Sequence, residues 1–177
     1  LDARYKDICR YDFRDPHEVG GTDHRDGIIR RYSDVKITPV ERGRPAHVAL
    51  DRSTGLLYFI DPGTATVNTL DTKSGTVEGP LTAPPESDEN YAEYSSVVNA
   101  SVKTVITSGL QVPVGIDIVG NRLLVGDRAT GLIHIYAING DSVASLGSVE
   151  TGATQLLGIV VGPDGRIWFV DKSKAMV

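Results

Sequence analysis

A short unit occurs three times in this sequence: an apolar strand, a tight turn, a second apolar strand and a closing aspartate. The three units cover residues 44–61, 112–127 and 156–171. Their apolar runs are too short for helices and are rich in valine, isoleucine, leucine and aromatic residues, which predicts β-strands. Their turns contain glycine or asparagine, the residues that accept the positive φ of hairpin turns. The repetition therefore predicts a series of antiparallel sheets.

The closing aspartates of the three units are Asp61, Asp127 and Asp171. The spacing of the last two falls within the ~40–50 residues that are typical of a four-stranded propeller blade. The wider spacing of the first two is attributed to an insertion at about 79–99, whose sequence we interpret as a polar loop without apolar periodicity. We predict third and fourth strands after the first two aspartates, at 66–71 and 76–78 and at 132–138 and 142–146.

The run from Val112 to Tyr136 contains a proline, Gly-Ile, a Leu-Val-x-Asp strand and a Gly-x-Ile-x-Ile-Tyr strand, and it resembles an NHL repeat. Residues 163–171 carry the same signature, and the resemblance covers about residues 44–177 apart from the insertion. It implies an all-β fold made of β-propeller blades with four antiparallel strands each. Relatives of this shape close with about six blades, so we expect an incomplete propeller of about two and a half to three blades.

Residues 1–43 are a candidate partial blade with a polar loop, and they precede the NHL-like blades of residues 44–177. The expected parts of this partial blade are an inner strand at 5–11, an elongated loop at 13–26 and outer strands at 27–32 and 35–40. The chain begins without methionine and stops where the apolar run Ala175–Val177 starts, so we expect the gene product to be longer.

Composition argues against several classes of protein. The net charge is -5, and nucleic-acid binding needs clustered positive charge, so no nucleic-acid partner is expected. The arginine-rich run Arg25–Arg31 is interpreted as a solvated strand edge. No stretch approaches the roughly 18 apolar residues of a membrane span. The single cysteine, Cys9, excludes a disulfide within the chain and a zinc site built on several cysteines. It is expected to be a small buried residue, with a partner cysteine outside this chain as the alternative.

Residues just before the innermost strand of each blade line one mouth of a propeller, where ligands usually bind. The ionisable residue among them is His47, and we take His47 and Arg128 as candidate ligand-binding residues; a hydrogen-bonded structural histidine is the alternative for His47. The repeat also resembles propeller lyases that cleave peptidyl-α-hydroxyglycine, which place zinc-ligating histidines directly after the strand-leading proline. The matching positions here are Ala46, Val114 and Leu157, and none of them can ligate a metal.

The loop around residues 17–26 is the candidate metal site. His17, Asp23 and His24 lie close together in sequence beside a Gly-Gly pair that would let them converge. No recognised ligand spacing is present, and a polar loop with Asx turns is the alternative. No other cofactor is predicted. The closing aspartates are expected to accept backbone N–H bonds in the following turns rather than to bind calcium.

The run Asn99-Ala100-Ser101 is a glycosylation sequon, which makes Asn99 a candidate site in a secreted glycoprotein. The function that the sequence favours is a non-enzymatic propeller module, extracellular or on a cell surface. Such a module would bind a protein or a glycan, or act as a scaffold in an assembly. One alternative is a propeller-type lyase or lactonase whose metal site lies mostly in blades outside this chain. Another is a structural subunit whose open blade edge is completed by another chain through strand pairing.

Overall fold

The structure is a computed structural model that describes residues 6–14, 23–38, 46–82 and 90–174. These residues form strands and turns without a helix, so the predicted all-β class is confirmed. No helix long and apolar enough to cross a membrane is found among them. The chain divides into two compact units, residues 1–36 with 74–101 and residues 37–73 with 102–177.

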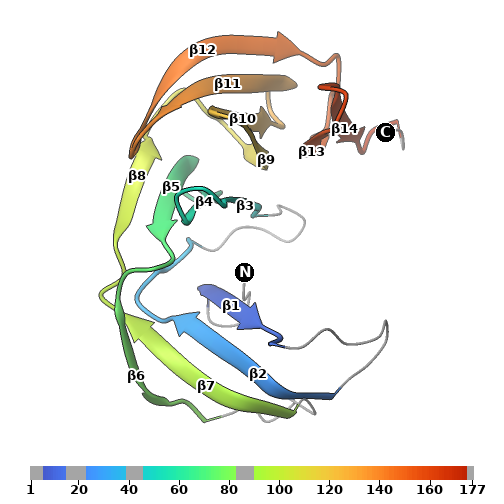
Figure 1. Cartoon of the computed structure of the whole chain (residues 1–177). Coiled ribbons are helices and arrows are strands. Elements are labelled where there is room, and N and C mark those ends of the chain that lie inside the picture. The colour runs from blue at the N-terminus through green and yellow to red at the C-terminus, as the bar shows by residue number, and fades with distance from the viewer. Residues whose placement is uncertain (1–5, 15–22, 39–45, 83–89, 175–177) are drawn as a thin grey trace. The chain divides into compact units, whose positions relative to one another are not determined.

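The second unit holds two four-stranded antiparallel sheets and a hairpin (Figure 1). The first sheet contains, in order, β3 (Val48–Asp51), β4 (Leu56–Asp61), β5 (Thr66–Asp71) and β8 (Val102–Ile106). The second sheet contains, in the corresponding order of neighbours, β9 (Pro113–Val119), β10 (Arg122–Asp127), β11 (Leu132–Asn139) and β12 (Ser142–Glu150). The hairpin consists of β13 (Leu156–Val161) and β14 (Ile167–Asp171). The strands β3, β9 and β13 lie side by side, so equivalent strands of successive sheets meet.

Successive sheets of this unit bury one another's faces. The strand β10 shows this clearly, because Leu123 and Val125 belong to the core that includes Tyr58 of the first sheet, whereas Leu124 packs with Leu156 of the hairpin. Alternate residues of one strand therefore serve two cores, as the two faces of a pleated sheet require. Full burial of each such side chain contributes about 1.5–3 kcal/mol. This arrangement confirms the predicted blades.

The fourth strand of the first sheet differs from the prediction. The segment predicted for it becomes β6 (Thr76–Pro80), which pairs with β7 (Asn90–Val98) in the first unit. The outer position beside β5 is taken by β8, whose Ile106 joins the core. The second half of the insertion is likewise a strand rather than a polar loop, because serine and tyrosine hydroxyls of β7 find partners on neighbouring side chains.

The first unit is a four-stranded sheet in the order β1-β2-β7-β6, with β1 at Ile8–Asp12 and β2 at Asp23–Tyr32. The expected inner strand and first outer strand thus exist and pair antiparallel. The expected strand at 35–40 does not form over residues 35–38, the part of it that the structure describes. The neighbour of β2 is instead β7, and the two run parallel. The parallel β2–β7 pair distinguishes this sheet from the antiparallel blades of the second unit.

Candidate functional site

The closing aspartates hold the ends of the blades in the second unit. The Asp127 carboxylate is fully buried and accepts the N–H groups of Gln111 (2.6 Å) and Val112 (3.1 Å), which lead into β9. It also accepts the N–H of Ala129 (2.9 Å) in the turn after β10. One carboxylate therefore joins the entry of a sheet to the turn after its second strand.

Asp171 makes the same kinds of bonds, and Asp61 makes the bond from the following turn. Asp171 accepts the N–H groups of Thr154, Gln155 and Ser173, and the Ser173 hydroxyl at 2.7 Å. The hydroxyl bond, followed by these backbone bonds, lowers the pKa of Asp171 although burial opposes the shift. Asp61 accepts the N–H of Gly63 at 3.1 Å. The predicted bonds from the following turns are thus confirmed.

The candidate mouth residues His47 and Arg128 both reach the segment around β13. The His47 ring is half-buried, and its Cε1 atom lies 3.6 Å from the point where a Cβ on Gly158 would stand. Burial lowers the pKa of His47, so its imidazole is neutral at pH 7. Arg128 donates from its guanidinium to the side-chain oxygen of Gln155 at 3.2 Å. The structure thus brings residues from the first and second sheets to residues 155–158 of the hairpin.

This arrangement offers an imidazole, a guanidinium and an amide side chain at the entry to the inner strands. Such groups donate hydrogen bonds to carbonyl or carboxylate oxygens. The backbone carbonyl of His47 accepts the N–H of Ile60 at 3.1 Å, a bond that does not involve the imidazole, so the structural alternative for this side chain stays a prediction as well. Ligand binding at His47 and Arg128 stays a prediction.

Asp117 is a polar residue of this region that the sequence analysis did not single out. It lies on β9, where its carboxylate accepts the N–H of Val161 on β13 at 2.7 Å and that of Ile118 at 2.8 Å. The bond to Val161 joins inner strands of neighbouring sheets. The available signal was an aspartate within the otherwise apolar run of β9.

The candidate metal site lies largely outside the described residues. His17 is outside them, and only the backbone of Asp23 and His24 is described, as the start of β2. Among the side chains that the structure does describe, no group of three or more His, Cys, Asp or Glu residues could hold a metal ion. A metal at His17, Asp23 and His24 stays a prediction.

The sequon residue Asn99 lies directly after β7 and is exposed, with a φ of 56°. Its N–H donates to the Asp34 carboxylate at 2.6 Å. The sequon residue Ser101 donates its N–H to the Ser74 hydroxyl at 2.8 Å. The sequon thus lies in an anchored and accessible turn, which suits a glycosylation site, although the modification itself stays a prediction.

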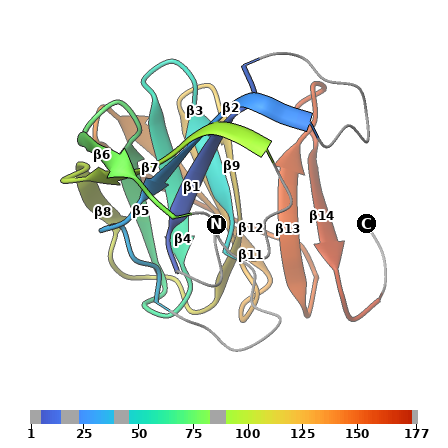
Figure 2. The same cartoon turned by 90° about the horizontal axis from the view of Figure 1, so that it is seen from below.

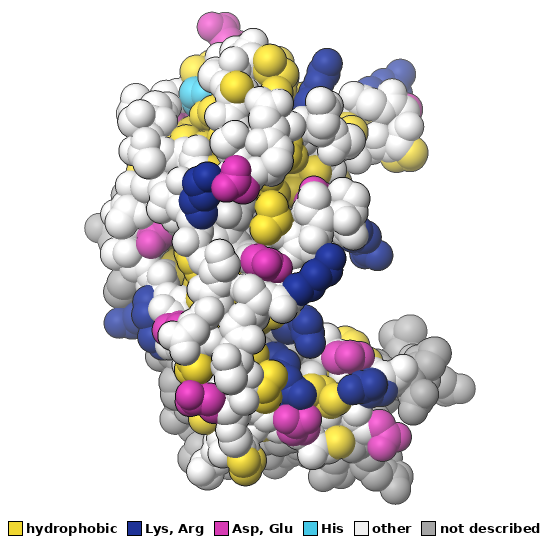
Figure 3. Space-filling view, turned by 60° about the vertical axis from the view of Figure 1, so that its left-hand side comes forward, with side chains coloured by type: hydrophobic (Ala, Val, Ile, Leu, Met, Phe, Trp, Pro, Cys, Tyr) yellow, Lys and Arg dark blue, Asp and Glu magenta, His cyan; other side chains and the backbone are white. Residues whose placement is uncertain are grey.

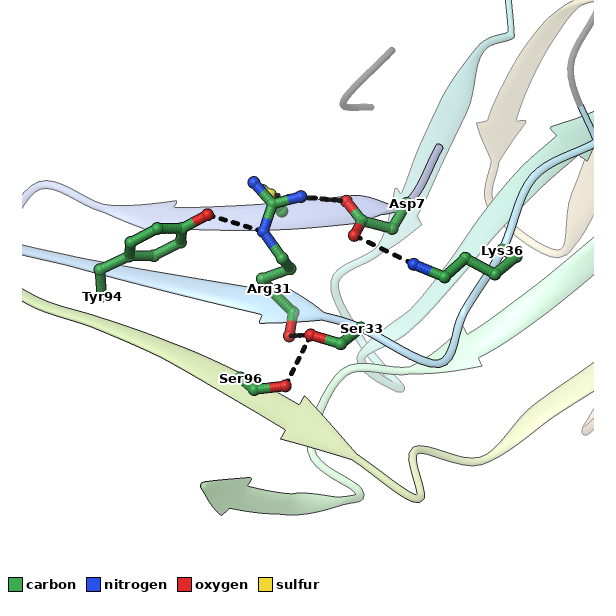
Figure 4. Close-up of polar contacts among 7 residues, drawn as sticks. Asp7, Arg31, Ser33, Lys36, Tyr94 and Ser96 are labelled. Atoms are coloured by element: carbon green, nitrogen blue, oxygen red, sulfur yellow. Dashed lines mark hydrogen bonds and ion pairs between the residues drawn. The ribbon is translucent and has the colours of Figure 1, made fainter. Parts of the chain in front are cut away.

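The first unit contains a buried ion pair (Figure 4). Asp7 and Arg31 are almost fully buried, and their side chains approach to 2.6 Å. Arg31 also donates to the Tyr94 hydroxyl at 2.7 Å, and the Lys36 ammonium lies 3.5 Å from Asp7. The half-buried Cys9 places its sulfur 4.0 Å from the same carboxylate. These partners offset part of the cost of taking the charges out of water.

The arginine-rich run therefore does not form the solvated edge that the sequence suggested. It lies on β2, an interior strand of its sheet, and Arg31 is buried. Arg30 pairs with Glu93 at 2.9 Å. On the face shown in Figure 3, Lys and Arg side chains are interspersed with Asp and Glu side chains.

The β13–β14 hairpin presents an apolar face to solvent. Val160 is paired across the hairpin with Trp168, and their side chains are 55% and 49% exposed. Val170 is 37% exposed. We call these three residues the hairpin face. Among the described residues β14 pairs with β13 alone (Figure 2). The strands β4 and β10 each have neighbours on both sides.

Comparison with models of known protein families finds no match, and comparison with curated proteins finds none either.

Proposed function

We propose that this chain is a non-enzymatic β-propeller module of the NHL-like kind that binds another polypeptide and so helps to build an extracellular or cell-surface assembly. The hairpin face is the observation that carries the proposal. The exposed turn that holds the Asn99 sequon supports the extracellular location.

The repeat itself indicates that the hairpin face is a packing surface. Aligning the closing aspartates places Trp168 at the position of Leu124 in the second sheet and of Tyr58 in the first. Leu124 is 5% exposed because the hairpin covers it, and Tyr58 is fully buried against the second sheet. Val170 corresponds in the same way to Gly126, where an added Cβ would meet Leu156 at 3.0 Å. The positions that a following sheet covers in the first two repeats are thus exposed in the third.

The chemistry of the hairpin face favours a polypeptide over a glycan. Trp168 is flanked by two valines, and aliphatic side chains give a sugar no hydrogen bonds. Aromatic and aliphatic side chains on a sheet pack well against a second protein surface. Covering the exposed half of one tryptophan contributes about 2 kcal/mol at ~25 cal/mol per Å².

The experiment places a photo-reactive amino acid at position 160 of the full chain in its native source. Leu146 on β12, which is 57% exposed, is the matched control position on another sheet. We expect one covalent product with a second polypeptide at position 160, its loss on Trp168→Lys, and no such product at position 146. Equal products at both positions, a product that survives Trp168→Lys, or no product at position 160 would overturn the proposal.

A further inference from the structure

We propose that Asn139 is a self-modification site, at which the Gly140 nitrogen attacks the Asn139 side chain and water then completes its conversion to aspartate and isoaspartate. Asn139 is the one asparagine of the chain that a glycine follows. It lies at the tip of the β11–β12 hairpin, where it pairs with Ser142 across the turn Gly140-Asp141. The site belongs to the second sheet and lies apart from the hairpin face on which the proposed function rests.

The reacting groups are accessible. Asn139 and Gly140 are both exposed, and so are Asp141 and Ser142. Among the described residues, no hydrogen-bond partner is found for the Asn139 side-chain amide or for the Gly140 N–H. A Cβ placed on Gly140 would meet no atom within 4 Å, so the surroundings of the attacking nitrogen are open.

The turn must open locally before the attack. Asn139 is the last residue of β11, and extended backbone does not align the following nitrogen with the side chain of the same residue. Rotation about the Cα–C bond of Asn139 brings the two together. Glycine at position 140, which has a φ of 63°, gives the turn the backbone freedom for this rotation. An exposed hairpin tip is also a segment that opens at low cost in free energy.

Ser142 makes the attacking nitrogen more reactive. Its hydroxyl donates to the Asn139 carbonyl oxygen at 2.9 Å. That carbonyl belongs to the same peptide group as the Gly140 nitrogen, and a hydrogen bond to the oxygen draws electron density away from the nitrogen. The Gly140 N–H therefore loses its proton more readily, which produces the nucleophile. Ser142 acts through this peptide group and is a positioning residue.

The reaction consumes one water and releases ammonia. The deprotonated Gly140 nitrogen bonds to the side-chain carbonyl carbon of Asn139, and the side-chain nitrogen leaves with a proton as ammonia. The product is a succinimide ring. Water then adds to one of the two ring carbonyls, and the ring nitrogen recovers a proton as its bond to that carbon breaks. Opening at the side-chain carbonyl gives aspartate, and opening at the main-chain carbonyl gives isoaspartate.

The products change the hairpin tip in charge and in length. A carboxylate replaces the amide close to Asp141, whose own carboxylate pairs with Lys103 of the first sheet at 2.8 Å. In isoaspartate the main chain also runs through the side-chain methylene of residue 139. This extra carbon displaces residue 139 from its pairing with Ser142. The aged chain should therefore have a looser β11–β12 turn.

Asn121 is the matched control within the chain. It lies in the β9–β10 turn, where the order of the two residues is reversed to Gly120-Asn121, and it is exposed like Asn139. The nitrogen that follows Asn121 belongs to Arg122, whose side chain crowds the attack. The two turns thus differ in the position of the glycine relative to the asparagine.

The experiment ages the full chain at neutral pH, cleaves it after lysine and arginine, and follows the peptides by chromatography and mass spectrometry. Cleavage places the two asparagines on separate peptides, 104–122 and 129–166. We expect peptide 129–166 to gain the mass difference between an amide and a carboxyl group, with isoaspartate among the products, while peptide 104–122 stays unchanged. Asn139→Gln should abolish the gain. The Ser142 N–H should exchange with deuterium faster in the aged parent chain than in aged Asn139→Gln.

Variants at Ser142 test its positioning role. Ser142→Ala should slow the reaction about fivefold, the rate equivalent of one hydrogen bond, and should displace the profile of rate against pH toward higher pH. Ser142→Thr keeps the hydroxyl and should restore the parent rate. An unchanged or faster reaction in Ser142→Ala would refute this role.

Three results would overturn the inference. The absence of a mass gain in peptide 129–166 would show that the turn does not react. An equal gain in peptide 104–122 would show that the position of the glycine does not matter. Aspartate without isoaspartate would show direct hydrolysis of the side-chain amide rather than attack by the Gly140 nitrogen.

Discussion

The Asp117 carboxylate of β9 accepts the N–H of Val161 on β13 at 2.7 Å, which fixes the inner strand of one sheet to that of the next. The acceptor is a carboxylate and both residues are half-buried. Removing the carboxylate would leave the Val161 N–H without this partner.

Replacement of Asp117 by alanine should therefore destabilise the second unit. We expect a loss of about 1 kcal/mol in the free energy of unfolding, the lower end of the range for removing a hydrogen-bond partner, because the Val161 N–H is only half-buried. Urea unfolding measures it. Glu150→Ala, at an exposed residue at the end of β12, is the control and should stay within about 0.5 kcal/mol of the parent chain. Equal losses in the two variants would contradict a role for the bond.

The pH dependence of stability should include Asp171. Its pKa in the folded chain is lowered, first by the Ser173 hydroxyl. A lowered pKa stabilises the fold above the ordinary value of about 4, and this contribution is lost as the pH falls through the lowered pKa. Ser173→Ala should raise the pKa of Asp171, as carboxyl carbon NMR would show. Ser148→Ala, on an exposed serine of β12, should leave the pKa unchanged. An unchanged Asp171 pKa in Ser173→Ala would refute the assigned cause.

Truncation at equivalent positions in the second and third repeats should differ in its cost to stability. Leu124→Ala removes a side chain that the hairpin buries, and it should cost about 2–5 kcal/mol in the free energy of unfolding. Trp168→Ala removes a half-exposed side chain at the matching position and should cost clearly less. Thermal or urea unfolding of both variants compares them directly. A larger cost for Trp168→Ala would mean that the described contacts of the hairpin face are incomplete.

The buried ion pair of the first unit should be costly to break. Asp7→Ala leaves Arg31 buried without its carboxylate and should destabilise this unit by about 3–5 kcal/mol. The double variant Asp7→Ala with Arg31→Met removes both charges and should recover part of the loss, which a double-mutant cycle would quantify. Additive effects in that cycle would show that the two side chains do not interact.

The sequence predicted the second-unit sheets where local signals agree with the fold. Turn residues, apolar runs and the aspartates at Asp61, Asp127 and Asp171 together indicated β4, β10 and β14. Prediction from the sequence failed for β7, a strand that is rich in hydroxyl groups. Ser96 on β7 is buried beside the Ser33 hydroxyl at 2.6 Å, a partner that is 63 residues away in sequence. Such a partner is fixed by strand register, which a local pattern does not contain.

The candidate site shows the same limit. His47 was found because a charged or polar residue before an inner strand stands out locally. Its neighbour Gly158, the Gln155 partner of Arg128 and the Asp117–Val161 bond all depend on how separate sheets meet. The burial of Arg31 depends in turn on β7 lying beside β2.

The late arrival of β8 has a consequence for the growing chain on the ribosome. When β5 emerges, its outer side has no strand to pair with until Val102 and the residues after it have been synthesised. At about 5–20 residues per second, that interval lasts roughly two to six seconds. During translation the nascent first blade thus exposes the unpaired backbone groups of β5. Variants that delay the synthesis of β8 should therefore favour misassembly even when the finished protein is equally stable.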